Sequence, residues 1–502
     1  MSYITRIFLI WAVLLSMPGL VFQAQGVTLT GKTTSFDPTP EGWFPFLKSI
    51  SVSPDSKRMA YVARNKENKF AVVTDGRMGP VFDSIGKSLP VFSLDSKRVA
   101  YTAKKGGKWY SVIDGKIGLK FDAVSIPKFS TDSSRVAYVA QKKKKQMLVV
   151  DGKTGKKYKG ILQKLNSPAF SPDASRVAFV ALVDKNGKKK MVMVVNGKAG
   201  RFYDSVSMPL FSPDSKHLAY SAKKGDKAFM IVDGVKKGRF DETGLYIYSP
   251  DSSRLIFSVQ KNGKWYMMEN IKSGPAFSAV TMPVFSSDSS RMSYVGVDAD
   301  GKVTMVVDGK KDKLYDSVTF LSYSPNNKRV GYAAKSGDKW FMVLDGKEGP
   351  GFDMVTFPLF SPDSKHFTYT ADKDNKTFVV MDGLEKEQYN RVDMPTFSND
   401  SSRYLYTARS GEKWYVIVNE EKGKGYDGVS IPVFGPDSKH VAYLAKKKGI
   451  WFVVVDEEKD DNWLLGGIKG AKLVFDSPDH IHTLAIRSPG LDFVRLEIDI
   501  EQ

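Results

Sequence analysis

The chain has 502 residues, too many for one ordinary compact core, so several domains or an array of repeats are expected. Hydrophobic residues make up 42% of the sequence and aromatic residues 12%, which excludes wholesale disorder. There is no cysteine and the formal net charge is +20, so disulfides, thiol catalysis and cysteine-based metal sites are excluded and anionic partners are favoured.

The first 26 residues have the pattern of a secretory signal peptide. Arg6 and the amino terminus supply positive charge, residues 7–15 form an apolar core, and Ala24-Gln25-Gly26 offers small residues to a signal peptidase. The alternative is an uncleaved anchor, but only about 16 apolar-leaning residues precede Gln23, whereas a membrane span needs about 20. We therefore expect cleavage near Gly26, no transmembrane span in the mature chain, and a periplasmic or secreted location.

A short string, Ser-Pro-Asp-Ser-Lys-Arg with variations, recurs from residue 53 almost to the C-terminus. Twelve copies follow one another at intervals of 37 to 42 residues. Their acidic or amide residues are Asp55, Asp95, Asp132, Asp173, Asp214, Asp251, Asp288, Asn326, Asp363, Asp400, Asp437 and Asp479. Chance does not produce such spacing, so the repeat is the unit of the fold.

The repeat over residues 429–466 shows the expected elements in chain order. An apolar segment with proline, residues 431–434, precedes a turn in which Pro436 fixes φ and Asp437 can bond to the following backbone. Period-two alternation then predicts a half-buried strand over residues 440–445. After a lysine-rich loop, a β-branched and aromatic run predicts a third strand over residues 451–455.

Two further signals complete most copies. The third strand usually ends in an Asp-Gly turn, as at Asp75-Gly76. A last short segment has an aromatic residue followed by aspartate, as at Phe82-Asp83. Four short strands in about 40 residues, with no helical period, predict an all-β fold, a β-propeller of about 12 four-stranded blades.

The units resemble the WD40-like (PD40-type) repeat of exported bacterial propellers, the type found in TolB. Residues 358–363, Pro-Leu-Phe-Ser-Pro-Asp, have the motif of that family, and the resemblance extends over residues 47 to 490. The family usually has glycine after the aspartate, whereas most copies here have serine or alanine. TolB also has a separate domain before its propeller that is missing here, so the resemblance implies the fold but not TolB's partners.

The sequence leaves open whether the blades form two six-bladed rings or one large ring. The last copy has only three strand-like segments, and the N-terminal segment Thr34-Ser35-Phe36-Asp37 matches the aromatic-Asp segment that it lacks. That pairing would join the two termini in one blade and fits a single ring. Because rings of six to eight blades are the commoner form, we expect two, with a first half over residues 27–278 and a second half over residues 279–502.

The excess positive charge lies in the loops between the second and third strands, mostly in the first half of the chain. In a propeller these loops leave the sheet on the same face as the connections from fourth to first strand. The candidate binding residues on that basic face are Lys104, Lys105, Lys142, Lys143, Lys144, Lys145, Lys188, Lys189, Lys190, Lys223 and Lys224. The alternative is a lysine fringe that only keeps an edge-rich β protein soluble.

No catalytic constellation stands out. The five histidines are scattered or occupy a repeat position, the acidic loops have too few ligands for calcium, and neither a Gly-x-Ser-x-Gly elbow nor a phosphate-binding glycine loop occurs. The aspartates recur in nearly every copy, as turn residues do and a catalytic acid does not. We expect neither cofactor nor metal.

These observations predict a non-catalytic binding scaffold of the cell envelope. Its partner would be an envelope protein or an anionic glycan or lipid surface, and export argues against nucleic acid. The alternatives are a propeller hydrolase or lyase with a site in its axial channel, and a structural surface component.

Overall fold

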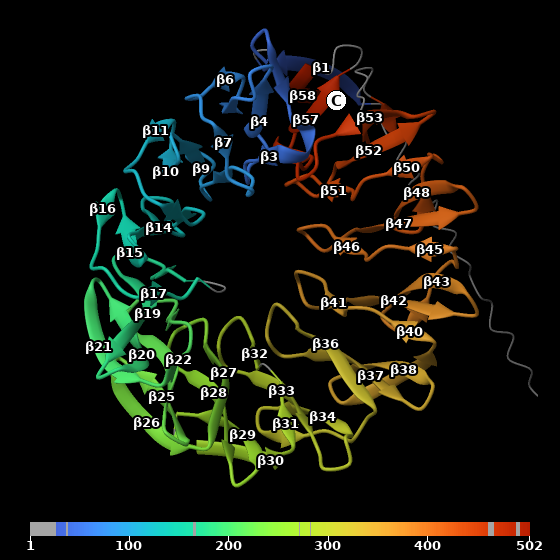
Figure 1. Ribbon diagram of the computed structural model, residues 1–502. Helices are drawn as coiled ribbons and strands as arrows, with labels where there is room; N and C mark the ends of the chain where they lie inside the picture. The colour runs from blue at the N-terminus through green and yellow to red at the C-terminus, as the bar shows by residue number, and fades with distance from the viewer. Residues whose placement is uncertain are drawn as a thin grey trace, which may run out of the picture.

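The computed structural model describes residues 27–36, 39–163, 167–270, 272–281, 283–459, 466–487 and 492–501. Within these residues the strands form twelve antiparallel sheets, which follow one another as the blades of one ring (Figure 1). The expected propeller of about 12 blades is confirmed. The expected signal peptide, residues 1–26, lies outside the described residues.

The preference for two six-bladed rings is wrong, because the blades on either side of residue 278 share one core. Ile256 and Met267 of the sixth blade pack with Met292, Tyr294 and Val306 of the seventh. The chain therefore continues from blade to blade at this point as it does elsewhere in the ring.

The inner strands of the blades face the central opening, and in ten blades they are split into two pieces. The pieces are β2 (Trp43–Pro45) and β3 (Ser51–Val52), β7 (Ser84–Ile85) and β8 (Val91–Phe92), β12 (Ala123–Val124) and β13 (Lys128–Phe129), β17 (Gly160–Ile161) and β18 (Ala169–Phe170), β22 (Ser205–Val206) and β23 (Leu210–Phe211), β31 (Ala279–Val280) and β32 (Val284–Phe285), β40 (Met354–Val355) and β41 (Leu359–Phe360), β45 (Arg391–Val392) and β46 (Thr396–Phe397), β50 (Gly428–Val429) and β51 (Val433–Phe434), and β55 (Gly466–Gly467) and β56 (Val474–Ser477). In the sixth and eighth blades the inner strand is continuous, as β27 (Glu242–Tyr248) and β36 (Ser317–Tyr323), and contains no proline. Most of the split strands have a proline at the break, where a missing N–H ends the ladder.

The other strands of each blade lie progressively further from the centre. The second strands are β4 (Met59–Asn65), β9 (Val99–Lys105), β14 (Val136–Lys142), β19 (Val177–Lys185), β24 (Leu218–Lys224), β28 (Leu255–Lys261), β33 (Met292–Val297), β37 (Val330–Ser336), β42 (Phe367–Lys373), β47 (Tyr404–Ser410), β52 (Val441–Lys447) and β57 (His480–Arg487). The third strands are β5 (Phe70–Thr74), β10 (Lys108–Ile113), β15 (Lys145–Val150), β20 (Lys188–Val195), β25 (Lys227–Val232), β29 (Lys264–Glu269), β34 (Val303–Val307), β38 (Lys339–Leu344), β43 (Lys376–Met381), β48 (Lys413–Val418), β53 (Ile450–Val455) and β58 (Asp492–Glu501). The outer strands are β6 (Arg77–Met78), β11 (Lys116–Ile117), β16 (Lys153–Thr154), β21 (Lys198–Tyr203), β26 (Val235–Phe240), β30 (Lys272–Phe277), β35 (Lys310–Lys311), β39 (Lys347–Phe352), β44 (Leu384–Glu385), β49 (Glu421–Lys422), β54 (Glu458–Lys459) and β1 (Thr28–Ser35).

A single turn of 3-10 helix, η1 (Leu47–Ser49), interrupts the first inner strand. Among the described residues no helix has the length and apolar character needed to cross a membrane.

The second strand of a blade is buried on both faces. In β14 the five residues from Val136 to Ala140 are all buried. The expectation of a half-buried second strand is therefore wrong. Alternation assumes that one face of the sheet meets water, whereas each blade packs a neighbour on both of its faces.

Aromatic side chains form the recurring contact between blades. The aromatic residue of the aromatic-Asp segment packs edge to face on an aromatic residue in the second strand of the next blade, with ring centroids 5.7 to 6.5 Å apart. The pairs are Phe82 with Tyr101, Phe121 with Tyr138, Tyr158 with Phe179, Phe240 with Phe257, Phe277 with Tyr294, Tyr315 with Tyr332, Phe352 with Tyr369, Tyr389 with Tyr406 and Tyr426 with Tyr443. Each such pair adds about 0.5–1.5 kcal/mol beyond the area it buries.

The turn between first and second strands makes a polar link to the next blade. The backbone N–H of Asp214 donates a hydrogen bond of 2.9 Å to Oγ of Ser252, the residue after the aspartate of the following copy. Equivalent bonds join Asp55 to Ser96, Asp95 to Ser133, Asp173 to Ser215, Asp251 to Ser289, Asn326 to Ser364, Asp363 to Ser401 and Asp400 to Ser438. Ser252 has φ of 67°, the left-handed region in which glycine is favoured. Serine stands here because glycine has no hydroxyl to accept this bond.

The two termini close the ring in one blade. Strand β1 pairs antiparallel with β58 over eight residues, from Thr28 with Glu501 to Ser35 with Val494, and the N–H of Phe36 donates to the carbonyl of Phe493. The prediction that the N-terminal segment supplies the missing strand of the last copy is confirmed for residues 34–36, while Asp37 lies outside the described residues. Across the last joint, the N–H of Lys472 donates to Oγ of Ser56.

The serine link predicts opposite effects of two substitutions. Ser252→Ala removes the acceptor for the N–H of Asp214, so we expect a loss of about 0.5–1 kcal/mol in the free energy of unfolding. Ala174→Ser supplies a hydroxyl to Asp132 in a copy that has none, so a gain of similar size is expected. Urea unfolding followed by circular dichroism measures both. Equal stability of the natural chain and both variants would contradict the role of the serine.

Candidate functional site

The lysine-rich loops are tight hairpins between the second and third strands. In the third blade, β14 and β15 pair in register up to Lys142 with Lys145, which leaves Lys143 and Lys144 as a two-residue turn. Both turn residues have positive φ, 49° and 62°. Such turns prefer Asn-Gly or Gly-Gly, as at Gly106-Gly107 in the second blade, because a side chain at positive φ is strained.

These hairpins lie on the same face as the connections between blades, as the sequence predicts. Nζ of Lys108, at the start of β10, lies 2.7 Å from Oδ1 of Asp122, in the connection to the third blade. The other carboxylate oxygen of Asp122 accepts the N–H of Lys143 at 2.8 Å. The pKa of Asp122 is lowered, chiefly by its hydrogen bond with Lys108. The aspartate of the aromatic-Asp segment thus links one blade to the hairpin of the next.

The same ion pair recurs around the ring and neutralises one lysine of each hairpin concerned. It joins Lys69 to Asp83, Lys190 to Asp204, Lys227 to Asp241, Lys302 to Asp316, Lys339 to Asp353 and Lys413 to Asp427. Among the residues proposed from the sequence, Lys190 therefore has a structural role, because Asp204 compensates its charge.

The third blade departs from this pattern. The residue after the aromatic Tyr158 is Lys159 rather than an aspartate, and it pairs with Asp184 of the next blade at 2.7 Å between Nζ and Oδ2. The carboxylate that would neutralise Lys145 is therefore missing. Sequence reasoning did not single out Lys159, although its departure from the aromatic-Asp pattern is visible there.

Ten of the eleven candidate lysines have no ion pair with a described carboxylate. They are Lys104, Lys105, Lys142, Lys143, Lys144, Lys145, Lys188, Lys189, Lys223 and Lys224, all of them exposed or half-exposed. The structure places them on neighbouring hairpins of the second to fifth blades. Lys142–Lys145 is the longest run, and its four side chains are exposed.

The three histidines at the repeat position take the place of arginine and hydrogen-bond through Nδ1 to the aspartate that ends the third strand. Nε of Arg58 contacts Asp75 at 2.7 Å, and Nδ1 of His440 contacts Asp456 at 2.6 Å in the equivalent place. Within the described part of the chain no group of three or more histidine, aspartate or glutamate side chains could hold a metal ion.

Comparison with solved structures finds propellers at low similarity. An eukaryotic initiation factor matches with 14% identity and a TM-score of 0.35 over 68% of this chain and 96% of that one. The β-propeller domain of the Trilobed protease from Pyrococcus furiosus matches with 14% identity and a TM-score of 0.24 over 57% of this chain and 91% of that one. TolB from Acinetobacter baumannii matches with 10% identity and a TM-score of 0.23 over 65% of this chain and 81% of that one. No family model and no curated protein matches the sequence. At such identities and scores the likenesses carry no information on function.

The strained turn predicts that stability can be gained by removing lysines. Changing Lys143→Asn and Lys144→Gly relieves positive φ at two residues, each at a cost of roughly 1 kcal/mol. We therefore expect slower hydrogen exchange in β14 and β15 and a higher melting temperature. Lys142→Ser with Lys145→Ser, on the same hairpin but outside the turn, is the matched control and gives no gain. A lower melting temperature of the turn variant would contradict the claim that the lysine turn is strained.

Proposed function

We propose that this chain is a non-catalytic, extracytoplasmic binding scaffold that holds an anionic surface on the hairpins of its second to fifth blades. The observation that supports this most is the run Lys142–Lys145. Its four lysines are exposed, none is paired with a described carboxylate, and two of them occupy turn positions that favour asparagine or glycine. A fringe that served only solubility would not need lysine at those two positions.

The recurring aspartates support a scaffold rather than an enzyme. Asp251 accepts hydrogen bonds from Ser249 and from the N–H of Ser253, which lower its pKa to about 2. Asp122 is equally committed to the joint between two blades. Both kinds of aspartate have a structural role in copy after copy, so neither needs a catalytic explanation.

The nature of the partner follows from the charge and from the N-terminal pattern. The signal-like first 26 residues favour a location in the envelope or outside the cell, where nucleic acid is not the expected polyanion. Anionic lipid headgroups and acidic glycans remain, together with acidic proteins of the envelope. Each lysine close to an anionic membrane contributes about 1 kcal/mol.

Binding to polyanions tests the proposal. The chain beginning at Val27 is titrated with phosphatidylglycerol vesicles and with polygalacturonate at low and moderate salt. Changing Lys142→Ser, Lys143→Asn, Lys144→Gly and Lys145→Ser should weaken binding at least tenfold, because about 1 kcal/mol is lost for each charge. Since the new turn is the favoured one, loss of binding cannot be attributed to loss of fold.

The matched control removes four lysines from the opposite face. Lys97, Lys216, Lys328 and Lys439 lie in the exposed turns between first and second strands. Their replacement by serine changes the net charge equally and should leave most of the binding intact. Absence of binding to both polyanions, or equal weakening by both variants, would overturn the proposal.

A further inference from the structure

The joint between the twelfth and first blades is held by a histidine and an aspartate, whereas most other joints use an arginine. At the first joint the guanidinium of Arg58 donates to the carbonyl oxygen of Ser96 in the second blade at 2.8 Å. The turn of the twelfth blade, residues 477–479, contains no arginine. Figure 1 shows β57 and β58 of that blade beside β3 and β4 of the first. There the polar contact comes from Asp476 and His482.

His482 uses both of its ring nitrogens at this joint. Nδ1 lies 2.7 Å from Oδ2 of Asp476, in β56 of the same blade. Nε2 lies 2.9 Å from the backbone carbonyl oxygen of Asp55 in the first blade, a residue 427 positions away in the sequence. The side chain of His482 is 1% exposed, so water is largely excluded from the ring. The second of these hydrogen bonds is therefore one of the contacts that close the ring of blades.

The two contacts of His482 require the charged form of its imidazole. A carbonyl oxygen only accepts hydrogen bonds, and an ionised carboxylate does the same. Burial raises the pKa of Asp476, but hydrogen bonds from Lys57 and His482 outweigh burial and hold that pKa below its usual value. Because Asp476 is thus ionised, both nitrogens of His482 have to donate. A neutral imidazole has a proton on only one of its nitrogens.

The fold itself does not require a histidine at this position. His482 pairs with Val474, and the second-strand residues in the same register of the other eleven blades are all uncharged. They are Ala60, Ala100, Ala137, Ala178, Ala219, Ile256, Ser293, Gly331, Thr368, Leu405 and Ala442. Burying an ionisable group costs free energy that none of these residues costs. The histidine occurs where the ring closes, so its role lies in the closure.

Asp476 also reaches the first blade, because its Oδ1 lies 2.8 Å from Nζ of Lys57. The other titratable groups around His482 on the packed elements are Asp55, Lys472, Asp479, His480, Arg495, Glu497 and Asp499. Nδ1 of His480 lies 2.6 Å from Asp499, and Arg495 pairs with Glu497 at 3.0 Å. A neutral imidazole keeps the single bond of His480. The bonding that changes on loss of a proton is therefore that of His482.

We propose that His482 and Asp476 form a proton-dependent latch that holds the twelfth blade on the first. When His482 loses a ring proton, either Asp476 or the carbonyl oxygen of Asp55 loses its donor beside a buried ring, and the joint is weakened. The bonds favour the protonated form in the closed ring, so the stability they add is present at lower pH and is lost as the pH rises. Imidazole titrates at about pH 6.5 in model peptides, which places the response between about pH 5.5 and about pH 8.

Nitrogen NMR of the histidine side chains tests the protonation in the chain beginning at Val27. The signals of His482 are those that disappear in His482→Ala, which introduces the residue found in the same register of six other blades. At about pH 5.5 both ring nitrogens should be protonated, and at about pH 8 only one. A neutral His482 at about pH 5.5 would overturn the proposal.

Hydrogen exchange read by mass spectrometry tests the latch, with rates corrected for the pH dependence of exchange itself. From about pH 5.5 to about pH 8, protection of β1 and β58 in the natural chain should fall at least tenfold, because a hydrogen bond of a charged group is lost. Protection of β29 and β34, at the joint of the sixth and seventh blades, should change little. In His482→Ala, protection of β1 and β58 should be low at both pH values.

His440→Arg is the matched control. His440 bonds through Nδ1 to Asp456 at 2.6 Å, a contact that a neutral imidazole keeps, and arginine occupies the equivalent place at Arg58. This variant should keep the pH response of β1 and β58. The proposal fails if their protection in the natural chain does not depend on pH over this range, or if His482→Ala retains the natural response.

Discussion

The structure depends on the packing of one blade against the next. A sheet of four short strands with apolar residues on both faces has no core of its own, and each blade acquires one only from its neighbours. The aromatic pairs place this core at the joints, as Phe121 of the second blade does on Tyr138 of the third. Since an end blade would expose one such face, the chain joins its ends through β1 and β58, and the ring has no open end.

Hydrogen bonds and ion pairs on both faces of the ring join the blades in addition to the apolar packing. On one face the N–H of Asp214 bonds to Ser252, and on the other Asp122 holds both Lys108 and the turn of the third blade. Such hydrogen bonds fix the register between blades, which apolar packing alone leaves open. The motif that makes the repeat visible in the sequence therefore consists of the residues that join the blades.

Much of the fold could be predicted because it is encoded in repetition. Blade number, strand order and the closing role of residues 34–36 all follow from comparing copies. The number of rings was predicted wrongly, because the preference for two rings rested on the commoner ring size, whereas the match between residues 34–36 and the strand that the last copy lacks fits a single ring. The two-sided burial of strands such as β14 was also missed, because alternation describes a sheet with one wet face.

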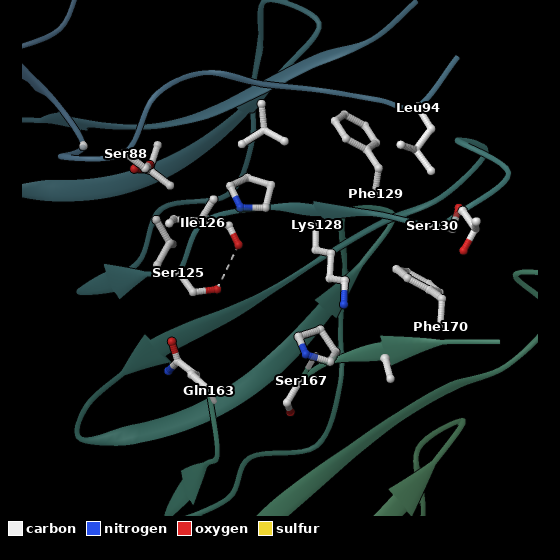
Figure 2. A pocket seen from close by; sticks show the side chains of 18 of the residues that line it. Ser88, Leu94, Ser125, Ile126, Lys128, Phe129, Ser130, Gln163, Ser167 and Phe170 are labelled. Carbon is white, nitrogen blue, oxygen red and sulfur yellow. Dashed lines mark hydrogen bonds between the residues drawn. The ribbon is translucent and has the colours of Figure 1, made fainter. Parts of the chain in front are cut away.

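The candidate sites could likewise be predicted from the sequence only in part. The basic hairpins could be predicted from their many lysines. The ion pair between Asp204 and Lys190 could not be predicted, and neither could the lack of a carboxylate beside Lys145, where Lys159 replaces the aspartate. A groove of about 1180 Å³ on the inner wall of the second to fifth blades was missed altogether (Figure 2). The inner segments of the second and fourth blades that border it are longer than in eight of the other copies, and the ring brings them to either side of the third blade.

Removal of the closing strand tests the central claim most directly. Hydrogen exchange read by mass spectrometry compares a chain beginning at Val27 with one beginning at position 37, with and without an added peptide of residues 27–36. If blades are stable only through their neighbours, the shorter chain loses amide protection in β58 and then in the adjoining blades, melts at a lower temperature, and recovers with the peptide. Unchanged protection and melting in the shorter chain would contradict the account.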